Sequence, residues 1–589
     1  MLTTVLSVVS LFVPCNLTAD AIYGDSCWPS ADDFAQLSSE LSGPLIQPHP
    51  LAQPCYLNFS SEDTHACSDV LEHWEDGWWR SGHPGAMQAP NFETYVTVDD
   101  DVQACFLNPS LAKGQCEQGS VPVVGVEARS VADIQAAVRF TGKHNLRLVV
   151  KNTGHDFFGR SSGKGSFMIW THHLKNITMH DSFRPLGAPA DEVYEHALTV
   201  GAGVQWDEAY AAADAAGRMI VGGISPGARA LSPTYGLGVD NVLEISLVTA
   251  DGTHLNTNAH QHPDLFWALR GGGGGTFSVV TSVTYRTFPV VPVVIAFLSV
   301  SVNASRPTPA LTAAFAELVR LSPTLTDAGW GGYTQFSAGN PGASEASRLG
   351  YTFFALMPGV SWEEANATIV PYLEYVQGLA KEDFATAGSD GASAKLTVDA
   401  AVTVPHPSFY QVYMSELPRT GQVGRNLELG SWLFPRDVLE NDYKRVAETL
   451  IDVSGLSFEL VAGGAVNRAN ASSTGLNPAW RKAVVHAVSG ITWKDGTPPA
   501  QIRALREIAK VKMAEIRALA PDSGAYFNEA SMYEPDPPKA FFGAHYEKLK
   551  AIKKVYDPTD LFLVRGGVGA ERWDDELRCR RPCYGPLSG

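Results

Sequence analysis

The sequence predicts an α+β fold with at least two lobes, and three observations support this prediction. From about residue 121, short apolar and β-branched runs alternate with amphipathic stretches of helical period. Glycine-dense loops follow several of the expected strands. The chain of 589 residues is 45% hydrophobic and 18% charged, which is enough apolar material for a large core and too much for a disordered chain.

Charge and composition exclude several classes of protein. The formal net charge is −18 at pH 7. Such an acidic surface repels phosphate backbones, so we expect no nucleic-acid partner. No stretch reaches the roughly 20 apolar residues that cross a bilayer, so we expect no membrane partner. The sequence also lacks internal repeats and a collagen-like period, which excludes a fibrous protein.

The first 20 residues have the pattern of an export signal. Val5 to Val13 form a short, mostly apolar run, and small and polar residues follow as far as Ala19 or Ala21. The basic residues that usually begin a signal are absent, and a buried N-terminal strand is the alternative. The Asn-x-Ser/Thr acceptors of N-glycosylation lie at Asn58, Asn176, Asn303, Asn366 and Asn470. We therefore expect a secreted glycoprotein.

The cysteines lie at the two ends of the chain. Cys15 would leave with the signal, and none occurs between residues 117 and 578. The others are Cys27, Cys55, Cys67, Cys105, Cys116, Cys579 and Cys583. An oxidising compartment permits disulfides that fasten such end segments to a large core. The short spacings favour the pairs Cys55–Cys67 and Cys105–Cys116, which leaves one of Cys27, Cys579 and Cys583 over without deciding which.

The sequence predicts no metal site. It contains no Cys-x-x-Cys pair and no His-Glu-x-x-His motif. The paired histidines His172 with His173, and His260 with His262, are expected in loops.

The expected elements begin after a long N-terminal segment. Residues 21–116 are rich in Pro, Ser, Trp and Cys and show little periodicity, which indicates a lead-in held by disulfides. Val121–Val126 is the first expected strand of an α/β pattern. Ser130 is expected to cap a helix, with Asp133 at the capping-box position. Leu146–Val150 then returns as a strand and leads into a glycine-dense loop.

A second group of strands follows. The strands are expected at His196–Val200, Val242–Thr249 and Ser278–Thr287, with a hairpin turn at Asp251-Gly252. The next region mixes strands with helices, and its clearest strands are Val293–Val302 and Arg348–Leu356.

Two long helices are expected near the C-terminus. One covers about residues 499–520, and the other stops at Asp557-Pro558. The apolar stripe of the first helix is Ile502, Leu505, Ile508, Ile516 and Leu519. The stripe of the second is Tyr546, Leu549, Ile552 and Val555.

Three glycine-rich segments lie at the ends of expected strands: Asn152–Gly163, Val221–Gly238 and Gly271–Gly275. Glycine adopts positive φ and lets the backbone approach a ligand closely, so successive N–H groups can surround an anion without a lysine or arginine. Ser161 and Ser162 add neutral donors. An acidic protein that binds a pyrophosphate needs such a neutral cradle, and plain tight turns are the alternative.

Other nucleotide and hydrolase motifs do not fit. Gly159–Lys164 resembles a Walker A loop but has three residues between its glycines where four are required. No Gly-x-Gly-x-x-Gly opens a helix after a strand. Gly223–Gly227 matches the nucleophile-elbow pattern around Ser225, but Pro226 follows the serine and has no N–H for an oxyanion hole. A serine hydrolase is therefore only a third interpretation.

The Asn152–Gly163 loop also contains His155, between Gly154 and Asp156. With Thr-Gly-His-Asp and Gly-Arg-Ser-Ser-Gly intact, it resembles the flavin-attachment loop of the vanillyl-alcohol-oxidase (PCMH-type) FAD proteins. Within them the chain resembles the fungal secreted branch related to isoamyl alcohol oxidase and berberine-bridge-like enzymes. The match continues through residues 198–203, 221–238, 264–277, 526–528 and 546–573.

The resemblance implies a bilobal FAD-binding fold with a substrate domain and a C-terminal berberine-bridge-like element. The implied segments are a signal peptide (1–20), a cysteine-linked N-terminal segment (21–116), a PCMH-type FAD-binding domain (117–290), a substrate domain (291–519), the berberine-bridge-like element (520–575) and a C-terminal tail (576–589).

The resemblance also implies roles for single residues. His155 would be joined to the flavin 8α-methyl carbon, and Asp156 would lie beside the cofactor. The other implied cofactor-binding residues are Gly154, Gly159, Ser161 and Ser162 at the pyrophosphate, Gly222, Gly223 and Ser225 in the second glycine-rich loop, and Asn528 in the C-terminal element. Relatives with two covalent links use a cysteine in the second loop, whereas this loop has none and Ser225 stands at about that position. We therefore predict a single covalent link.

The implied activity is the oxidation of a small, apolar molecule. A flavin accepts a hydride at N5, and the protein must orient the substrate C–H bond and remove the proton of its O–H or N–H group. Tyr526 matches a family tyrosine on the reactive side and is the candidate base, with packing on the flavin ring as the alternative. We expect a monomeric oxidase that reacts with O₂ to give H₂O₂. A flavin dehydrogenase, an oxidative cyclase and a secreted binding protein without turnover are the alternatives.

Overall fold

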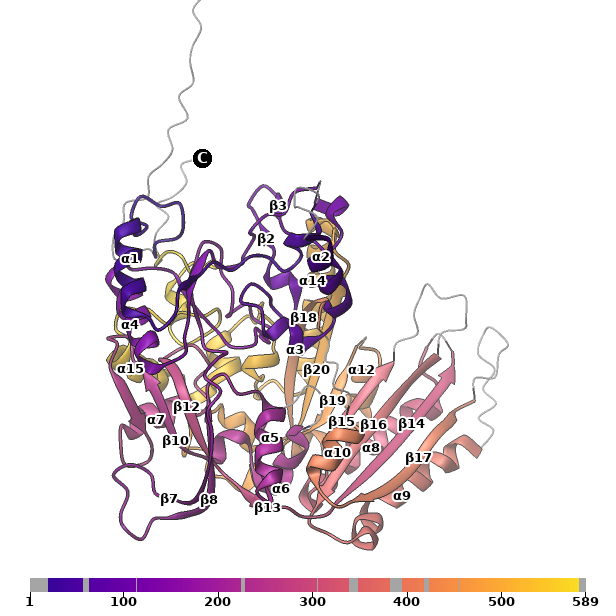
Figure 1. Cartoon of the computed structure of the whole chain (residues 1–589). Helices are drawn as coiled ribbons and strands as arrows, with labels where there is room; N and C mark the ends of the chain where they lie inside the picture. The colour runs from indigo at the N-terminus through magenta and orange to yellow at the C-terminus, as the bar shows by residue number, and fades with distance from the viewer. Residues whose placement is uncertain are drawn as a thin grey trace, which may run out of the picture.

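The structure is a computed structural model (Figure 1). It describes residues 20–56, 63–112, 114–223, 228–304, 306–337, 348–381, 395–417, 423–453 and 455–581. Residues 1–19, which make up nearly all of the predicted signal peptide, lie outside the described residues, as do the sequon at Asn58, Ser225 and Cys583. No helix within these ranges has the length and apolar character needed to span a bilayer.

A small sheet of four strands carries the first lobe. Its order is β1 (Leu45–Ile46), β4 (Val124–Glu127), β6 (Phe167–Trp170) and β5 (Leu148–Lys151), and β4, β6 and β5 are parallel. Helix α4 (Val131–Lys143) packs on this sheet. The predicted capping box is confirmed, because the Ser130 side chain accepts from the Asp133 N–H and the Asp133 carboxylate accepts from the Ser130 N–H.

An antiparallel sheet of five strands forms the second lobe. Its order is β11 (His254–Thr257), β10 (Val242–Val248), β12 (Val279–Arg286), β8 (Tyr194–Gly201) and β7 (Ile177–Phe183). The predicted hairpin turn is confirmed: Gly252 has φ +80° and joins β10 to β11. Helix α5 (Trp206–Ala215) and the short α6 (Ser232–Tyr235) lie between this sheet and the third one.

The third sheet has seven antiparallel strands and fans outward on the right of Figure 1. Its order is β17 (Thr397–His406), β14 (Val293–Asn303), β16 (Arg348–Pro358), β15 (Gly331–Ser337), β19 (Ser457–Leu460), β20 (Ala483–Trp493) and β18 (Asn426–Pro435). Its covering helices are α8 (Pro309–Ala328), α9 (Trp362–Lys381), α12 (Tyr443–Ile451) and α14 (Pro499–Leu519).

The two faces of this sheet differ. Phe458 and Trp432 lie on the face covered by the helices, where Phe458 packs on Phe315 of α8. Because side chains alternate along a strand, Glu459 and Leu433 lie on the opposite face. That face shares a buried cluster with α5, α6 and the five-stranded sheet. This face, here called the inner face of the sheet, therefore packs toward α5 and the glycine-rich loop at 221–238.

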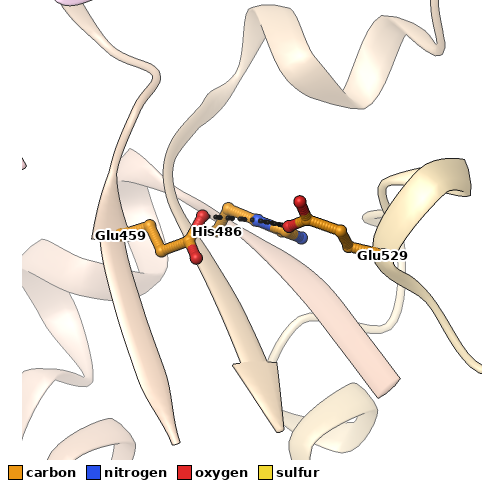
Figure 2. Close-up of side chains that lie close together, drawn as sticks. All are labelled: Glu459, His486 and Glu529. Atoms are coloured by element: carbon orange, nitrogen blue, oxygen red, sulfur yellow. Dashed lines mark hydrogen bonds and ion pairs between the residues drawn. The ribbon is translucent and has the colours of Figure 1, made fainter. Parts of the chain in front are cut away.

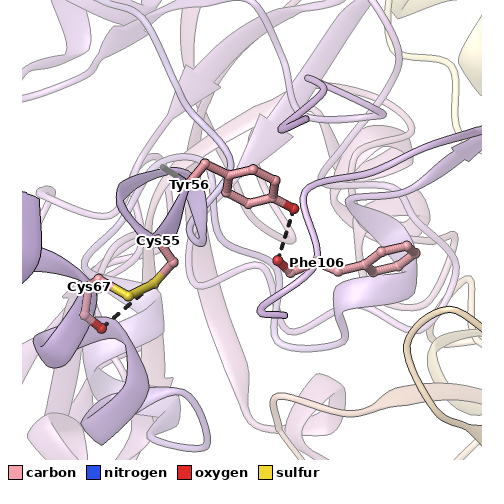
Figure 3. Close-up of a disulfide and its surroundings, with 4 residues drawn as sticks. All are labelled: Cys55, Tyr56, Cys67 and Phe106. Atoms are coloured by element: carbon pink, nitrogen blue, oxygen red, sulfur yellow. Dashed lines mark hydrogen bonds between the residues drawn. A yellow bond between two sulfur atoms is a disulfide. The ribbon is translucent and has the colours of Figure 1, made fainter. Parts of the chain in front are cut away.

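The N-terminal segment is more regular than its sequence indicated. It contains α1 (Ala31–Glu40), α2 (Asp63–His73) and α3 (Gly77–Ser81), and its strand β1 extends the first sheet. The predicted disulfides Cys55–Cys67 and Cys105–Cys116 are confirmed. Figure 3 shows that the Tyr56 hydroxyl, beside the first disulfide, donates to the Phe106 carbonyl oxygen beside the second at 3.0 Å. Cys27 and Cys579 are also disulfide-bonded.

Two predicted core positions are wrong. Ile508 of α14 and Val555 of the last helix, α15 (Tyr546–Tyr556), are 60% and 68% exposed. Both belong to correctly predicted helices, but each lies at the edge of the apolar stripe, where no neighbouring layer covers it. Tyr546, Leu549 and Ile552 are buried as expected. The four histidines expected in loops are in loops.

Candidate active site

The Asn152–Gly163 loop, here called the flavin loop, begins directly after β5. Gly154 and Gly159 have φ of +77° and +71°. A Cβ atom would lie 2.9 Å from the Ala86 carbonyl oxygen at the first position and 3.0 Å from the Phe92 ring at the second. The loop therefore requires glycine at both positions, for conformation and for space.

The cysteine-linked N-terminal segment supports the flavin loop from behind. The Gln88 N–H donates to the Gly154 carbonyl oxygen at 3.1 Å. The Ser162 hydroxyl donates to the Phe92 carbonyl oxygen at 2.7 Å, and Ser161 and Ser162 are both buried. The sequence did not indicate this support, since residues 86–93 lie far from the loop in sequence. A cofactor contact for the two serines stays a prediction.

The side chains of His155 and Asp156 have different surroundings. The His155 side chain is exposed on the loop, edge-on to the Phe157 ring at 5.1 Å between centroids. An exposed imidazole can react with a ligand. The Asp156 carboxylate instead accepts the Phe158 N–H at 2.9 Å and pairs with Arg160 Nε at 3.0 Å. Asp156 thus organises the loop, and its predicted cofactor contact is untested.

Arg160 connects the flavin loop to the C-terminal element. Its Nη2 donates to Asn528 Oδ1 at 2.8 Å, and Asn528 Nδ2 donates to Tyr526 Oη at 2.7 Å. Arg160, which the sequence analysis missed, therefore joins Asp156 to Asn528, and Asn528 in turn contacts Tyr526. Arg160 Nη1 is buried and has no hydrogen-bond partner among the described residues. An unpaired guanidinium N–H beside a glycine-lined loop fits an anionic ligand such as a pyrophosphate.

A cavity of about 440 Å³ opens beside the flavin loop. Gly159, Arg160 and Ser162 line one wall, and Asn426 and Trp493 of the seven-stranded sheet line another. Ligand pockets commonly have a volume of about 300–1,000 Å³. The structure therefore brings predicted cofactor-binding residues to the wall of a cavity that can hold a small molecule.

The second glycine-rich loop packs on helix α5. A Cβ atom at Gly222 would lie 2.3 Å from the Trp206 ring, so this indole fixes the backbone there. The Gly223 carbonyl oxygen accepts from the Tyr210 hydroxyl at 3.4 Å. Ser225 lies outside the described residues. The predicted cofactor contacts of this loop stay predictions.

Figure 2 shows a polar cluster of Glu459, His486 and Glu529, whose histidine lies against Tyr526. His486 of β20 is 0% exposed, and its Nδ1 lies 3.1 Å from Glu459 Oε2 of β19 and 3.9 Å from Glu529 Oε2. The Tyr526 ring is perpendicular to the His486 ring at 5.6 Å between centroids. Sequence reasoning missed this cluster because its members come from two strands and a later turn.

The cluster offers one ligand atom from each residue, all within 4.8 Å of one another. A cation could bind such a set only if it displaced the hydrogen bond between His486 Nδ1 and Glu459. The Ser457 hydroxyl also donates to Glu459 Oε1 at 3.1 Å, and Gln335 Nε2 donates to the Ser457 hydroxyl at 2.8 Å. We interpret the cluster as a hydrogen-bonded chain that orients His486.

Lys151, the last residue of β5, is buried directly behind the flavin loop. Its Nζ donates to the His83 carbonyl oxygen at 3.1 Å and the Asn152 carbonyl oxygen at 3.4 Å. Burial lowers the pKa of Lys151 from 10.5 to about 7, although the nearby Glu93 carboxylate opposes the shift. Lys151 therefore carries an unfavourably buried charge below neutral pH and is a neutral amine above it.

This shift predicts a pH-dependent stability. Between pH about 7 and about 10 the unfolded chain keeps a proton that the folded Lys151 has released, so the free energy of unfolding rises with pH in this range. Lys151→Met should remove that part of the rise, as measured by urea unfolding at several pH values. Lys175→Met, which changes a partly exposed lysine paired with Glu208, should keep the wild-type slope. Equal slopes for wild type and Lys151→Met would contradict the prediction.

Comparison with known proteins decides the family. The FAD binding domain family matches residues 122–258, and the berberine and berberine-like family matches residues 525–569. An uncharacterized FAD-linked oxidoreductase of Arthroderma benhamiae is 35% identical over 96% of this chain and 96% of its own. The chain belongs to the FAD-linked oxidoreductases. The family resemblance, the α+β FAD-binding fold and the FAD cofactor are thereby confirmed.

Solved structures agree with this placement. The VAO-type flavoprotein MtVAO615 from Myceliophthora thermophila C1 is 28% identical, with a TM-score of 0.80 over 96% of this FAD-linked oxidoreductase and 100% of its own chain. A glucooligosaccharide oxidase from Acremonium strictum is 18% identical, with a TM-score of 0.59 over 76% of this chain and 92% of its own. The second likeness shows the fold alone. The protein is an oxidoreductase that takes FAD and a small-molecule substrate.

Proposed function

We propose that this FAD-linked oxidoreductase is a secreted, monomeric oxidase that acts on an alcohol carbon of a small, apolar molecule. O₂ is the proposed final acceptor, giving H₂O₂. The observation that carries the proposal is the hydrogen-bonded path from the flavin loop through Arg160 and Asn528 to Tyr526. This path couples the residues that hold the cofactor to a hydroxyl group that can contact the substrate.

The proposed cofactor link is a single covalent bond from His155. The glucooligosaccharide oxidase structure is named for an FAD joined to both a cysteine and a histidine. The exposed His155 ring supports the histidine link here, and the loop at 221–238 contains no cysteine for a second one. Gly154, Gly159 and Ser161 would hold the pyrophosphate with neutral donors, and the Ser162 hydroxyl could join them only by leaving the Phe92 carbonyl oxygen.

In the proposed reaction the protein orients the substrate and handles its proton. The bound flavin supplies a two-electron acceptor. Tyr526 contacts the reacting hydroxyl group and takes part in the removal of its proton. Trp480, perpendicular to Tyr526 at 5.5 Å between centroids, and the apolar sheet face around it exclude water from that position.

Secretion is supported by the two disulfides and by the sequons. Disulfides persist in oxidising compartments. Among the described sequons, Asn176, Asn303 and Asn470 have exposed side chains, as glycan acceptors require.

The test combines flavin absorbance with peroxide detection. The purified protein is mixed without oxygen with 3-methylbutan-1-ol, benzyl alcohol and a series of longer alcohols, and the visible flavin band is followed. We expect at least one alcohol to bleach the band, and air to restore it with about one H₂O₂ per flavin. Bleaching without peroxide would favour a dehydrogenase or cyclase. No bleaching by any alcohol would contradict the proposed reaction.

A further inference from the structure

One imidazole nitrogen on the inner face of the seven-stranded sheet, the face that carries Glu459, is buried without a hydrogen-bond partner among the described residues. His486 Nε2 has no hydrogen-bond partner among the described residues, and the side chain is 0% exposed. Buried polar atoms in folded proteins almost always have a partner, so an unpaired one calls for an explanation such as a catalytic role. Tyr526 packs edge-on against this ring, and the Trp480 ring lies tilted against it at 5.8 Å between centroids. The free nitrogen therefore lies among the aromatic side chains proposed to enclose the substrate.

The other nitrogen of the ring is fixed by a chain of hydrogen bonds. Gln335 donates to the Ser457 hydroxyl, and this hydroxyl donates to the Glu459 carboxylate. The carboxylate in turn accepts from His486 Nδ1. Because the proton is held on Nδ1, the lone pair of the neutral ring is on Nε2. A carboxylate that orients an imidazole in this way is the arrangement of a general base.

We propose that His486 is the proton acceptor of the reaction, oriented by Glu459, while Tyr526 holds the reacting oxygen by a hydrogen bond. This inference rests on the proposed function. The O–H bond of the alcohol breaks, and its proton forms an N–H bond at Nε2. The C–H bond of the carbon that carries this oxygen also breaks. Its hydrogen leaves with the electron pair as a hydride, which the flavin would accept, and a C=O bond remains.

The charged groups around the ring favour this role. Glu459 from β19 and Glu529 from the turn Phe527–Glu529 face Nδ1, and both carboxylates stabilise the positive charge that the ring gains with a proton. The titratable groups on the neighbouring elements are Tyr526, against the ring, and Tyr333 of β15, opposite Glu459.

The first test needs no substrate turnover. Diethyl pyrocarbonate acylates unprotonated imidazole nitrogens, and peptide mass spectrometry locates the product in the holoenzyme. We expect His486 to react, more slowly at low pH, and benzyl alcohol to protect it. His260 is a matched control, because its Nε2 lies 2.8 Å from a carboxylate oxygen of Glu192 near the surface, and benzyl alcohol should not protect it. Labelling of His260 but not of His486 would overturn the proposal.

The second test measures the pH profile of flavin reduction without oxygen, using the alcohol that reduces the wild type fastest. We expect the wild-type rate constant to rise with pH through one ionisation. His486→Gln should lower the rate constant about a hundredfold and abolish the ionisation in its pH profile. Glu459→Gln should shift that ionisation. Tyr526→Phe and His260→Gln should keep the ionisation. An unchanged pH profile in His486→Gln would overturn the proposal. The proposal would also fail if the wild type held one equivalent of a tightly bound metal and Glu459→Gln lost it. If no alcohol reduces the wild type, the proposed function fails, and the labelling result still decides the role of His486.

Discussion

We expect His155→Ala to lose its flavin on acid precipitation, whereas the wild-type precipitate should stay yellow. The reason is that His155 is the exposed nucleophilic side chain of the flavin loop, and the second loop contains no cysteine. Without the imidazole the cofactor is held by hydrogen bonds and packing only, and acid unfolding releases it. The visible spectrum of the washed precipitate measures the effect, which is all-or-none.

Two controls keep this prediction decisive. Ser225→Ala should keep an acid-stable flavin, because a serine hydroxyl is a far weaker nucleophile than a thiolate, and unchanged activity in this variant would also exclude a serine hydrolase. An acid-labile flavin in the wild type would disprove covalent attachment. An acid-stable flavin in His155→Ala would place the link elsewhere.

Tyr526→Phe should lower the rate constant of flavin reduction by about 10²–10⁴-fold while leaving the acid-stable flavin in place. The variant keeps the ring contacts with Trp480 and His486 and removes only the hydroxyl that accepts from Asn528. Loss of a group that hydrogen-bonds the reacting oxygen raises the barrier of the chemical step without unfolding the site. Rapid-mixing absorbance without oxygen measures the rate constant.

Asn528→Ala is the companion variant, because it removes the donor to Tyr526 and the acceptor of Arg160 but keeps the phenol. We expect an intermediate decrease, since the Tyr526 hydroxyl is then less well oriented. If Tyr526→Phe reduced the flavin at the wild-type rate, the tyrosine would be a packing residue, and its proposed hydrogen bond to the reacting oxygen would be wrong.

Local patterns predicted most of the fold. The capping box at Ser130, the hairpin at Gly252 and the two short-range disulfides depend on residues close together in sequence, and the structure confirms each of them. The same kind of pattern placed the long helix α14 within about one residue at each end. It failed for Ile508, because the width of a buried stripe depends on what covers the helix.

The candidate site was only partly predictable. The glycines of the flavin loop could be found because positive φ and close packing leave no other residue possible there. Arg160 stood in the same loop but carried no signal of its own, since its partners are hundreds of residues away. Glu459 and His486 are 27 residues apart in sequence, and only the register of β19 against β20 makes them neighbours.

The sequence by itself indicated the family and the FAD cofactor through its resemblance to known proteins, and it indicated the main strands, the helices and the glycine-rich loops through residue types at short spacings. The tertiary structure decided which side chains meet. Strand register and sheet packing placed Glu459 and His486 beside Tyr526 and joined Arg160 to Asn528. Such contacts form because apolar faces of distant segments are buried against one another. The spacing of the polar residues along the sequence does not indicate which of them will become neighbours.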